Sequence, residues 1–505
     1  MAKVGIKTNS LWSISNYGIS VASLFFLFPF MVHRLGSSSY GFFIFLGTIN
    51  GMASIANFGF GEASLRFIAF YHNSQDYKSL KNIISTSFWT YLVLGSLTTL
   101  AILLLAKPIV GLLKETEIDI SLALRLVNIS ALTFMIRFIL GIFSTIPQAV
   151  QRFDISSRIS IFETILRFGF YLAVLFAGYG LTGIVLSELL LSILIAVTNF
   201  YFSSRLLDTF NLIGKPSSST FKEIFNYSII SFITQMVGLL WQYTDRILLG
   251  YFIGSAAIAY FSVPQQIIFK ILGLVTAASV VLFPRFSIAR LDEFSKELYK
   301  EFTLISLLFT IVAFSTLSFI IKDFISLWIS PSFAAETKNI AIVLAISCMI
   351  RGAFPIYEYL FKGIGKPIYN MYIIIASSLI IVILDFMLIP VLGLNGAGIA
   401  YLLSPVAGIV AIIFIWLKLL KAPLSEPFRI YLVPLLISYF ILAISFLVKR
   451  RIYFPPSWLI IILQMVIFLV LQISMLFGYF KLFAPEVLVK LADLKNRTRS
   501  IWKPF

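Results

Sequence analysis

The sequence predicts an all-α protein that crosses a membrane many times, with about fourteen transmembrane helices. Hydrophobic residues make up 59% of the 505 residues, charged residues only 12%, and the mean hydropathy is +0.98. A water-soluble domain has no means of burying that much apolar surface, and no long polar stretch is present to form one. Apolar stretches recur along the whole chain, and each is long enough for a helix of roughly 20 residues across a bilayer.

Short polar connections separate the apolar stretches, and the first stretch lacks a signal-peptidase cleavage pattern, so we interpret it as a retained span. Because the number of spans is even, both ends of the chain are expected on the same side of the membrane. The expected spans are about 10–32, 40–62, 84–106, 120–146, 156–177, 181–202, 223–251, 257–283, 302–321, 338–361, 368–390, 395–419, 428–448 and 457–480.

Basic residues decide the orientation, because Lys and Arg collect in cytoplasmic loops. Most of the loop Lys and Arg fall on the inner side when both termini are cytoplasmic, which explains much of the net charge of +17 without nucleic acid. The basic tail at 481–505 is expected on the inner membrane surface. One outer loop departs from the rule, since it carries Lys449, Arg450 and Arg451.

Two short motifs recur at similar offsets in the second half of the chain. LGSSSYGFF at 35–43 resembles IGSAAIAYF at 253–261, and GLTG at 180–183 resembles GLNG at 393–396. The repeat predicts two six-helix lobes with the same orientation, related by a pseudo-twofold axis along the membrane normal. The expected parts are an N-terminal lobe at 1–205, a C-terminal lobe at 206–421, two additional transmembrane helices at 422–480 and the cytoplasmic tail at 481–505.

The seventh expected span combines apolar length with polar side chains. Gln235, Gln242 and Arg246 stand at i, i+7 and i+11, so they share one face of a helix. A charge at membrane depth costs a few kcal/mol, so this face is expected to contact protein or a water-filled cavity. Asp245 points about 100° away from Arg246, which leaves it for a proton, a cation or another helix.

The charged residues within spans are mostly basic, and they come from both expected lobes. Arginine offers a planar fork that fits phosphate oxygens, and its attraction for an anion grows in a low-dielectric site. We therefore expect a cationic central cavity that binds an anion. Its candidate residues are Arg125, Arg137, Arg167, Arg246, Lys270 and Arg351, with Asn57, Gln235 and Gln242 as polar neighbours.

Some of these basic residues can be explained as ion pairs with acidic residues in the spans, without any role in binding an anion. Glu163 and Arg167 stand at i, i+4 and can neutralise each other. Arg125 and Glu188 lie near span ends, from which their side chains reach the interface. The candidates for coupling to a proton or sodium ion are Asp245, Glu163, Glu358 and Asp385.

No catalytic motif is recognisable in the sequence. A phosphate-binding Gly-rich loop with its Lys, an HExxH helix and a nucleophile–histidine pairing are all lacking. The single cysteine, Cys348, excludes an internal disulfide and makes a Cys/His metal site unexpected. We therefore expect no enzyme activity and no cofactor, with energy supplied by an ion gradient or by the cargo gradient.

Several motifs resemble those of the polysaccharide lipid-carrier flippases, the O-antigen and exopolysaccharide repeat-unit translocases. These belong to the multidrug/oligosaccharidyl-lipid/polysaccharide exporter superfamily. The matching residues are LG at 35–36, YG at 40–41, NFGFG at 57–61, SLRF at 64–67, TDR at 244–246, Gly250, IG at 253–254 and AY at 259–260. The resemblance covers essentially the whole chain.

The resemblance implies that an undecaprenyl-diphosphate-linked oligosaccharide is flipped from the inner to the outer leaflet of the bacterial cytoplasmic membrane by alternating access. The cationic cavity would then bind the diphosphate or an anionic glycan, and both termini would be cytoplasmic. Membrane lipid and the polysaccharide polymerase and chain-length machinery are the implied partners. Arg66 matches a basic position of the family, and an ordinary inner-side charge explains it equally well.

Other functions stay open at this point. A lipid II flippase, which moves a peptidoglycan precursor, fits the charge as well, but the Gly-Phe-Gly and Asp-Arg patterns are closer to the polysaccharide branch. A cation-coupled multidrug exporter favours an acidic cavity, whereas this chain has a surplus of Arg and Lys. A membrane glycan polymerase or ligase would need a long external loop, and a channel would not need a two-lobe repeat. The sugar structure is not specified by the sequence.

Overall fold

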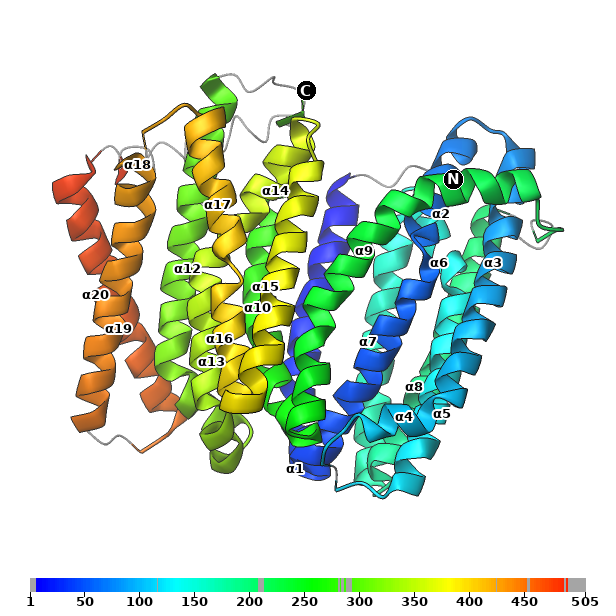
Figure 1. Ribbon diagram of the computed structural model, residues 1–505, viewed down its shortest axis with the longest axis horizontal. Coiled ribbons are helices and arrows are strands. Elements are labelled where there is room, and N and C mark those ends of the chain that lie inside the picture. The colour runs from blue at the N-terminus through cyan, green and yellow to red at the C-terminus, as the bar shows by residue number, and fades with distance from the viewer. Residues whose placement is uncertain are drawn as a thin grey trace. The chain divides into compact units, whose positions relative to one another are not determined.

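A computed structural model describes residues 6–115, 117–207, 213–279, 282, 286–287, 293–423, 425–451, 455–485 and 487–488. The chain forms two compact units, residues 1–260 and residues 261–505. Every element in the described residues is helical, and none is a strand. The prediction of an all-α polytopic membrane protein is therefore confirmed (Figure 1).

The number of spans is close to the expected fourteen. Among the described residues, twelve helices are long and apolar enough to cross a membrane, and a thirteenth is a bent pair. The first of them, Ile14–Asn57, has 44 residues. A straight helix of that length would be roughly 66 Å long, about twice the thickness of a bilayer core, so it supplies two spans.

Those two spans are the arms of α1 (Ile6–Ala53), which turns at Gly36. Gly36 has φ 79°, a left-handed value that glycine adopts without a steric penalty. Beyond the turn, the ring of Tyr40 packs edge-on against Phe28 of the first arm, with ring centroids 6.0 Å apart. In Figure 1 the two blue arms meet at the α1 label. Gly36 therefore separates the first two expected spans.

A second break follows α1, where the expected span at 40–62 is interrupted. The 3-10 turn η1 (Ser54–Asn57) ends at Phe58 and Gly59, whose φ values are 46° and 77°, and α2 (Phe60–Asn73) begins directly afterwards. A Cβ atom on Gly59 would lie 2.4 Å from the carbonyl oxygen of Ser228 in α9. The NFGFG motif thus forms a kink that only glycine fits, because it needs both a left-handed backbone and a close helix approach.

The rest of the first unit consists of helices that begin at polar caps. Asp76 accepts from the backbone N–H of Ser79 at the start of α3, and Asp119 accepts from Ser121 and Leu122 at the start of α5. The elements are α3 (Tyr77–Leu104), α4 (Ala106–Gly111), α5 (Ile120–Ile139), α6 (Gly141–Ala149), α7 (Phe153–Phe176), α8 (Gly180–Leu207) and α9 (Ser218–Phe252). The arms of α9, Ser218–Ile229 and Ser231–Phe252, meet at 49°.

Helix α9 packs against α1, α2 and α3 of the first unit. Its last turn leads into α10 (Ser255–Ser279), and here the two copies of the sequence repeat meet. The hydroxyl oxygens of Ser38 and Ser255 lie 2.8 Å apart, and the Ser255 amide donates to the carbonyl of Glu115. Gly254, with φ 132°, allows this turn. The boundary expected between 205 and 206 stays a prediction.

The second unit is built around α12 (Glu293–Trp328), which packs along α13 (Pro331–Arg351). The elements that follow are α14 (Phe354–Gly363), α15 (Ile368–Leu392), α16 (Leu394–Leu403), α17 (Val406–Phe414), the π-helix η4 (Ile415–Leu419), α18 (Ser425–Pro427), the π-helix η5 (Phe428–Leu432), α19 (Val433–Arg451) and α20 (Trp458–Phe483).

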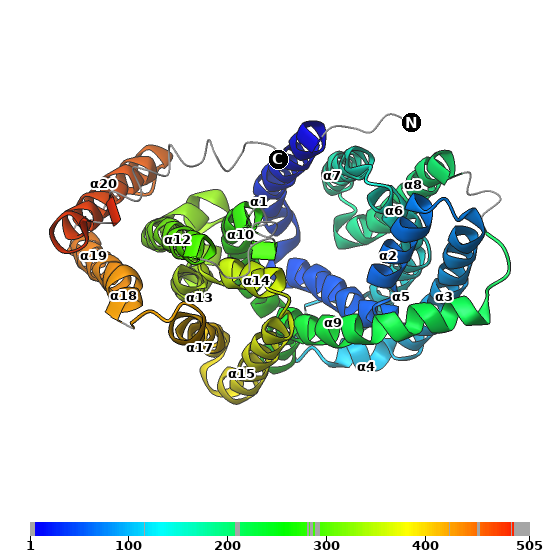
Figure 2. The same ribbon diagram turned by 90° about the horizontal axis from the view of Figure 1, so that it is seen from above.

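The two additional helices, α19 and α20, attach to α12 through a buried polar contact. Gln472 of α20 donates to Ser315 of α12 and to Ser438 of α19, at 2.6 and 2.9 Å. Phe319 stacks on Phe468 with centroids 4.9 Å apart. Figure 2 shows both helices beside α12. Most of the tail expected at 481–505 lies outside the described residues.

Candidate functional site

Four charged side chains from three helices of the first unit converge on one point. Arg137 lies in the last turn of α5, Glu163 and Arg167 lie one turn apart on α7, and Glu188 lies on α8. We call these four residues the charged tetrad. Tyr171 lies one further turn along α7 from Arg167, so helical spacing places it on the same face as the α7 members.

Short contacts join all members of the charged tetrad. Arg137 Nη2 lies 2.7 Å from Glu188 and 3.4 Å from Glu163. Arg167 uses two nitrogens, with Nη2 2.5 Å from Glu163 and Nε 2.8 Å from Glu188. The Tyr171 hydroxyl donates to the same Glu188 oxygen at 2.5 Å. Each carboxylate therefore binds both arginines.

The charged tetrad is neutral as a whole, because two guanidinium groups face two carboxylates. Neutrality matters within a span, since an uncompensated charge at membrane depth costs a few kcal/mol. Glu188 is the least exposed member at 16% of its side chain, and Arg137 is the most exposed at 43%. The exposed guanidinium group of Arg137 is therefore held by two half-buried carboxylates.

Arg137 keeps most of its hydrogen-bonding capacity. A guanidinium group has five N–H donors, and within the described residues the polar contacts of Arg137 involve Nη2 alone. The acidic partners fix the position of the group, while Nε and Nη1 stay available. A preorganised arginine of this kind suits a phosphate or carboxylate ligand.

The sequence identified only part of this arrangement. The Glu163–Arg167 pair on α7 follows from i, i+4 spacing and is present. Glu188, which we expected to reach towards the interface, instead binds both arginines, and the contribution of Tyr171 was missed. The spacing of Glu163, Arg167 and Tyr171 at i, i+4 and i+8 was the available signal.

The polar face of α9 is the second group of candidates. Asp245 is buried at 2% exposure, Arg246 and Gln235 are half-buried, and Gln242 is exposed. The Arg246 guanidinium lies 5.7 Å from the ring centroid of Tyr243, within range of a cation–π interaction. These residues lie on one continuous helix, and the contact of their polar face with a cavity stays a prediction.

Three further candidates in the first unit have local roles. Arg66 is exposed and lies over the ring of Tyr227, 4.4 Å from its centroid. Asn57 accepts the backbone N–H of Gly61 at 3.0 Å, which stabilises the start of α2. Arg125 is exposed near the start of α5 and donates to the Ser121 carbonyl at 3.4 Å.

The candidates in the second unit lie on four different helices. Arg351 is buried at 6% exposure at the end of α13, where it donates to Ser404 and lies 4.5 Å from the ring centroid of Tyr401. Glu358 pairs with Lys362 at 2.5 Å on α14. The two remaining candidates are Lys270, half-buried on α10, and Asp385, fully buried on α15.

The described residues contain no group of three His, Cys, Asp or Glu side chains that would hold a metal ion.

Comparison with known proteins identifies the family. Residues 6–290, more than half of the chain, match the family described as "Polysaccharide biosynthesis protein". A protein of Shigella flexneri described as a putative O-antigen transporter is 24% identical over 79% of this chain and 94% of its own length. A teichuronic acid biosynthesis protein, TuaB of Bacillus subtilis, is 24% identical over 40% of this chain and 41% of its own length.

Solved structures show the same fold. The lipid II flippase MurJ in an inward closed conformation has a TM-score of 0.70 at 16% identity, over 93% of this chain and 99% of that protein. A multidrug resistance MATE family transporter of the MOP superfamily, in its inward-facing conformation, has a TM-score of 0.64 at 15% identity, over 81% of this chain and 94% of that protein. The resemblance found in the motifs is confirmed: this chain belongs to the polysaccharide biosynthesis protein family and has the fold of the MOP superfamily.

Proposed function

We propose that this protein flips an undecaprenyl-diphosphate-linked oligosaccharide, an O-antigen or exopolysaccharide repeat unit, from the inner to the outer leaflet of the bacterial cytoplasmic membrane. The family match supports a role in polysaccharide biosynthesis. The Shigella relative supports transport, because it is described as a transporter and is covered almost to its full length. The many apolar helices supply the membrane setting.

The observation that carries the proposal is the state of Arg137. Its guanidinium group is 43% exposed, and among the described residues two carboxylates hold it through a single nitrogen. The remaining N–H groups suit the oxygens of a diphosphate, which arginine binds through paired hydrogen bonds. We propose that Arg137 is the first anion contact and that Arg246 on the polar face of α9 is a second.

The carboxylates of the charged tetrad would allow the bound diphosphate to leave, because they weaken its binding to Arg137. A diphosphate that approaches Arg137 competes with Glu163 and Glu188 for the same cation, so its binding is weaker than binding to an unpaired arginine. Protonation of Glu163 would remove one competitor and strengthen anion binding. We therefore propose that the tetrad couples proton movement to cargo binding.

We further propose alternating access with both termini in the cytoplasm. MATE family transporters with this fold have been solved in inward-facing and outward-facing conformations, which supports alternating access for the fold. The distribution of loop Lys and Arg supports the orientation.

Lipid II is the second candidate cargo, since it is also a diphosphate on a lipid carrier. The likeness to MurJ is one of fold at 16% identity, whereas the sequence relatives are described by O-antigen and teichuronic acid. We therefore rank lipid II below a polysaccharide repeat unit.

Ligand-dependent stabilisation separates these candidates. A ligand that binds the folded protein at 100 times its dissociation constant stabilises it by about 2.7 kcal/mol. The thermal midpoint of the purified protein in detergent is measured with undecaprenyl-diphosphate oligosaccharide, lipid II and a cationic dye. The proposal expects the largest rise with the oligosaccharide and no rise in Arg137→Gln, with Arg125→Gln as the matched control. A rise with the dye alone would show that the cargo is cationic.

A further inference from the structure

The basic end of α19 has no role in the proposed function. Lys449, Arg450 and Arg451 form its last turn, and both arginines are exposed. With both termini in the cytoplasm this end lies at the outer leaflet, where the positive-inside rule disfavours such a cluster. A basic cluster on the outer side therefore suggests a negatively charged binding partner there.

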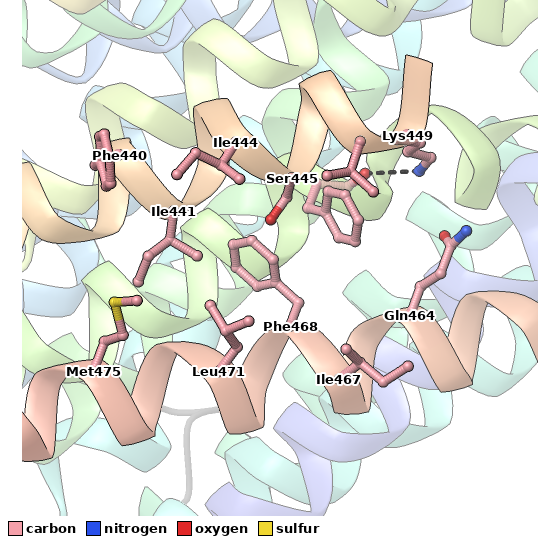
Figure 3. Close-up of a pocket in the computed structure, with 12 residues that line it drawn as sticks. Phe440, Ile441, Ile444, Ser445, Lys449, Gln464, Ile467, Phe468, Leu471 and Met475 are labelled. Carbon is pink, nitrogen blue, oxygen red and sulfur yellow. Dashed lines mark hydrogen bonds between the residues drawn. The ribbon is translucent and has the colours of Figure 1, made fainter. Parts of the chain in front are cut away.

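An apolar groove leads away from this basic end, between α19 and α20 and over Phe319 of α12. Its volume is about 400 Å³, within the ~300–1,000 Å³ range of small-molecule sites. Figure 3 shows Phe440 and Met475 at one end and Lys449 and Gln464 at the other. The remaining lining residues are apolar apart from Ser445: Ile441, Ile444, Val448, Ile467, Phe468 and Leu471.

The groove has the length of a hydrocarbon chain within one leaflet. Its lining extends from residue 440 to residue 449 on α19 and from residue 464 to residue 475 on α20. These stretches correspond to roughly 14–17 Å along a helix, about half the thickness of a bilayer core. The groove therefore matches the length of an acyl chain in one leaflet, with the lipid headgroup at the basic end.

The polar end of the groove has a lysine fixed by two polar contacts, and it carries excess positive charge. Lys449 Nζ lies 2.7 Å from Asp323 and donates to the carbonyl of Phe319 at 3.0 Å, which fixes the lysine between α12 and α19. Asp323 balances one of the three cations in the last turn of α19, so this turn keeps a net charge of about +2.

Gln464 adds an acceptor at the same end. Its side-chain oxygen, Oε1, is buried and accepts no hydrogen bond from the described residues. A buried polar atom without a partner is costly, so a donor is expected there. A hydroxyl of a phospholipid headgroup is one such donor.

We propose that the groove binds an anionic phospholipid of the outer leaflet. One acyl chain fills the space between α19 and α20, the phosphate lies at Arg450 and Arg451, and a headgroup hydroxyl donates to Gln464. The occupant is a glycerophospholipid rather than a helix of another protein, because the lining is apolar over the length of one leaflet and its polar end lies at the basic last turn of α19. This bound lipid also explains why the outer cluster is basic.

Native mass spectrometry of the full-length protein tests the proposal. The probes are phosphatidylglycerol and phosphatidylcholine with the same acyl chains, each added in detergent, and the readout is the fraction of protein that retains one lipid. Each basic residue near an anionic surface contributes about 1 kcal/mol, or roughly fivefold. We expect R450Q/R451Q to lose the preference for phosphatidylglycerol by tenfold or more.

Two further variants separate the mouth from the groove. Ser445→Trp fills the groove and is expected to abolish retention of both lipids, whereas Leu447→Trp, on an exposed position of α19 outside the lining, retains them. Lys107→Gln removes an exposed charge from α4 and is the control for charge alone. Unchanged thermal midpoints show that the variants fold.

Two results would overturn the proposal. The first is retention of phosphatidylglycerol by both R450Q/R451Q and Ser445→Trp at the level of the unchanged protein. The second is a preference for undecaprenyl diphosphate over phosphatidylglycerol that the same variants remove, since the groove would then hold the cargo's own chain.

Discussion

The guanidinium group of Arg137 donates to the carboxylate of Glu188 across 2.7 Å, which joins the end of α5 to α8. Glu188 also accepts from Arg167 and from the Tyr171 hydroxyl, so one carboxylate holds three side chains. This contact makes Arg137 a positioned cation rather than a mobile one.

Arg137→Gln is expected to reduce cargo flipping at least tenfold in liposomes while the protein stays folded. The glutamine keeps a donor for Glu188 but loses the charge and the paired N–H groups that bind phosphate. Arg125→Gln, on an exposed position of the same helix, is expected to keep full activity. Equal flipping by both variants would exclude Arg137 as the anion contact.

Glu188→Gln is expected to lower the free energy of unfolding by about 1.5–3 kcal/mol, because the hydrogen bonds to both arginines lose their ionic acceptor. In a double-mutant cycle with Arg167→Gln, the two losses should not add, and the coupling energy should be about 0.5–3 kcal/mol. Additive losses in guanidinium or thermal unfolding would show that the Arg167–Glu188 contact between α7 and α8 contributes nothing to stability.

Gly59→Ala is expected to destabilise the first unit by more than about 1 kcal/mol. The alanine would need a left-handed backbone, and its Cβ would lie 2.4 Å from the Ser228 carbonyl oxygen. Gly238→Ala on α9 is the control, since a Cβ there meets no atom within 4 Å. Thermal unfolding of both variants measures the difference, and a Gly59→Ala midpoint at or above that of Gly238→Ala would refute the close approach of α9.

The start of α5 is expected to loosen in acid. Hydrogen bonds from the Ser121 side chain and the Leu122 amide hold the pKa of Asp119 below its ordinary value of 3.8. A lowered pKa contributes stability above the unfolded value, and that stability is lost as the pH falls through the folded value. Amide exchange at Leu122 should therefore accelerate, relative to the intrinsic rate, between about pH 5 and pH 3. Asp119→Asn should remove this pH dependence, and an unchanged profile in the variant would assign the effect elsewhere.

Much of the fold was predictable because a bilayer imposes strong constraints. Apolar length alone located the spans, and the structure places helices over nearly all of them. The turn at Gly36 also fell between two expected spans. The break at Phe58 and Gly59 was not predicted, because apolar residues continue through it and hydropathy does not report a left-handed backbone.

The candidate site was predictable only where its residues share a helix. Glu163 and Arg167 follow from i, i+4 spacing, which is a local property. The Arg137–Glu188 contact joins residues 51 positions apart, and it depends on how α5 and α8 pack. Helix α5 ends at Ile139, so Arg137 lies in its last turn, while the candidate span continues through α6 to Ala149.

The most direct test of the central claim is a leaflet-access measurement. The purified protein is reconstituted in liposomes that contain a labelled undecaprenyl-diphosphate oligosaccharide, and an impermeant reagent reports the fraction of cargo in the exposed leaflet. The account predicts protein-dependent exposure that Arg137→Gln reduces and Arg125→Gln does not. It would be contradicted if the reagent found no exposure of the oligosaccharide in vesicles where the same protein moves a cationic dye.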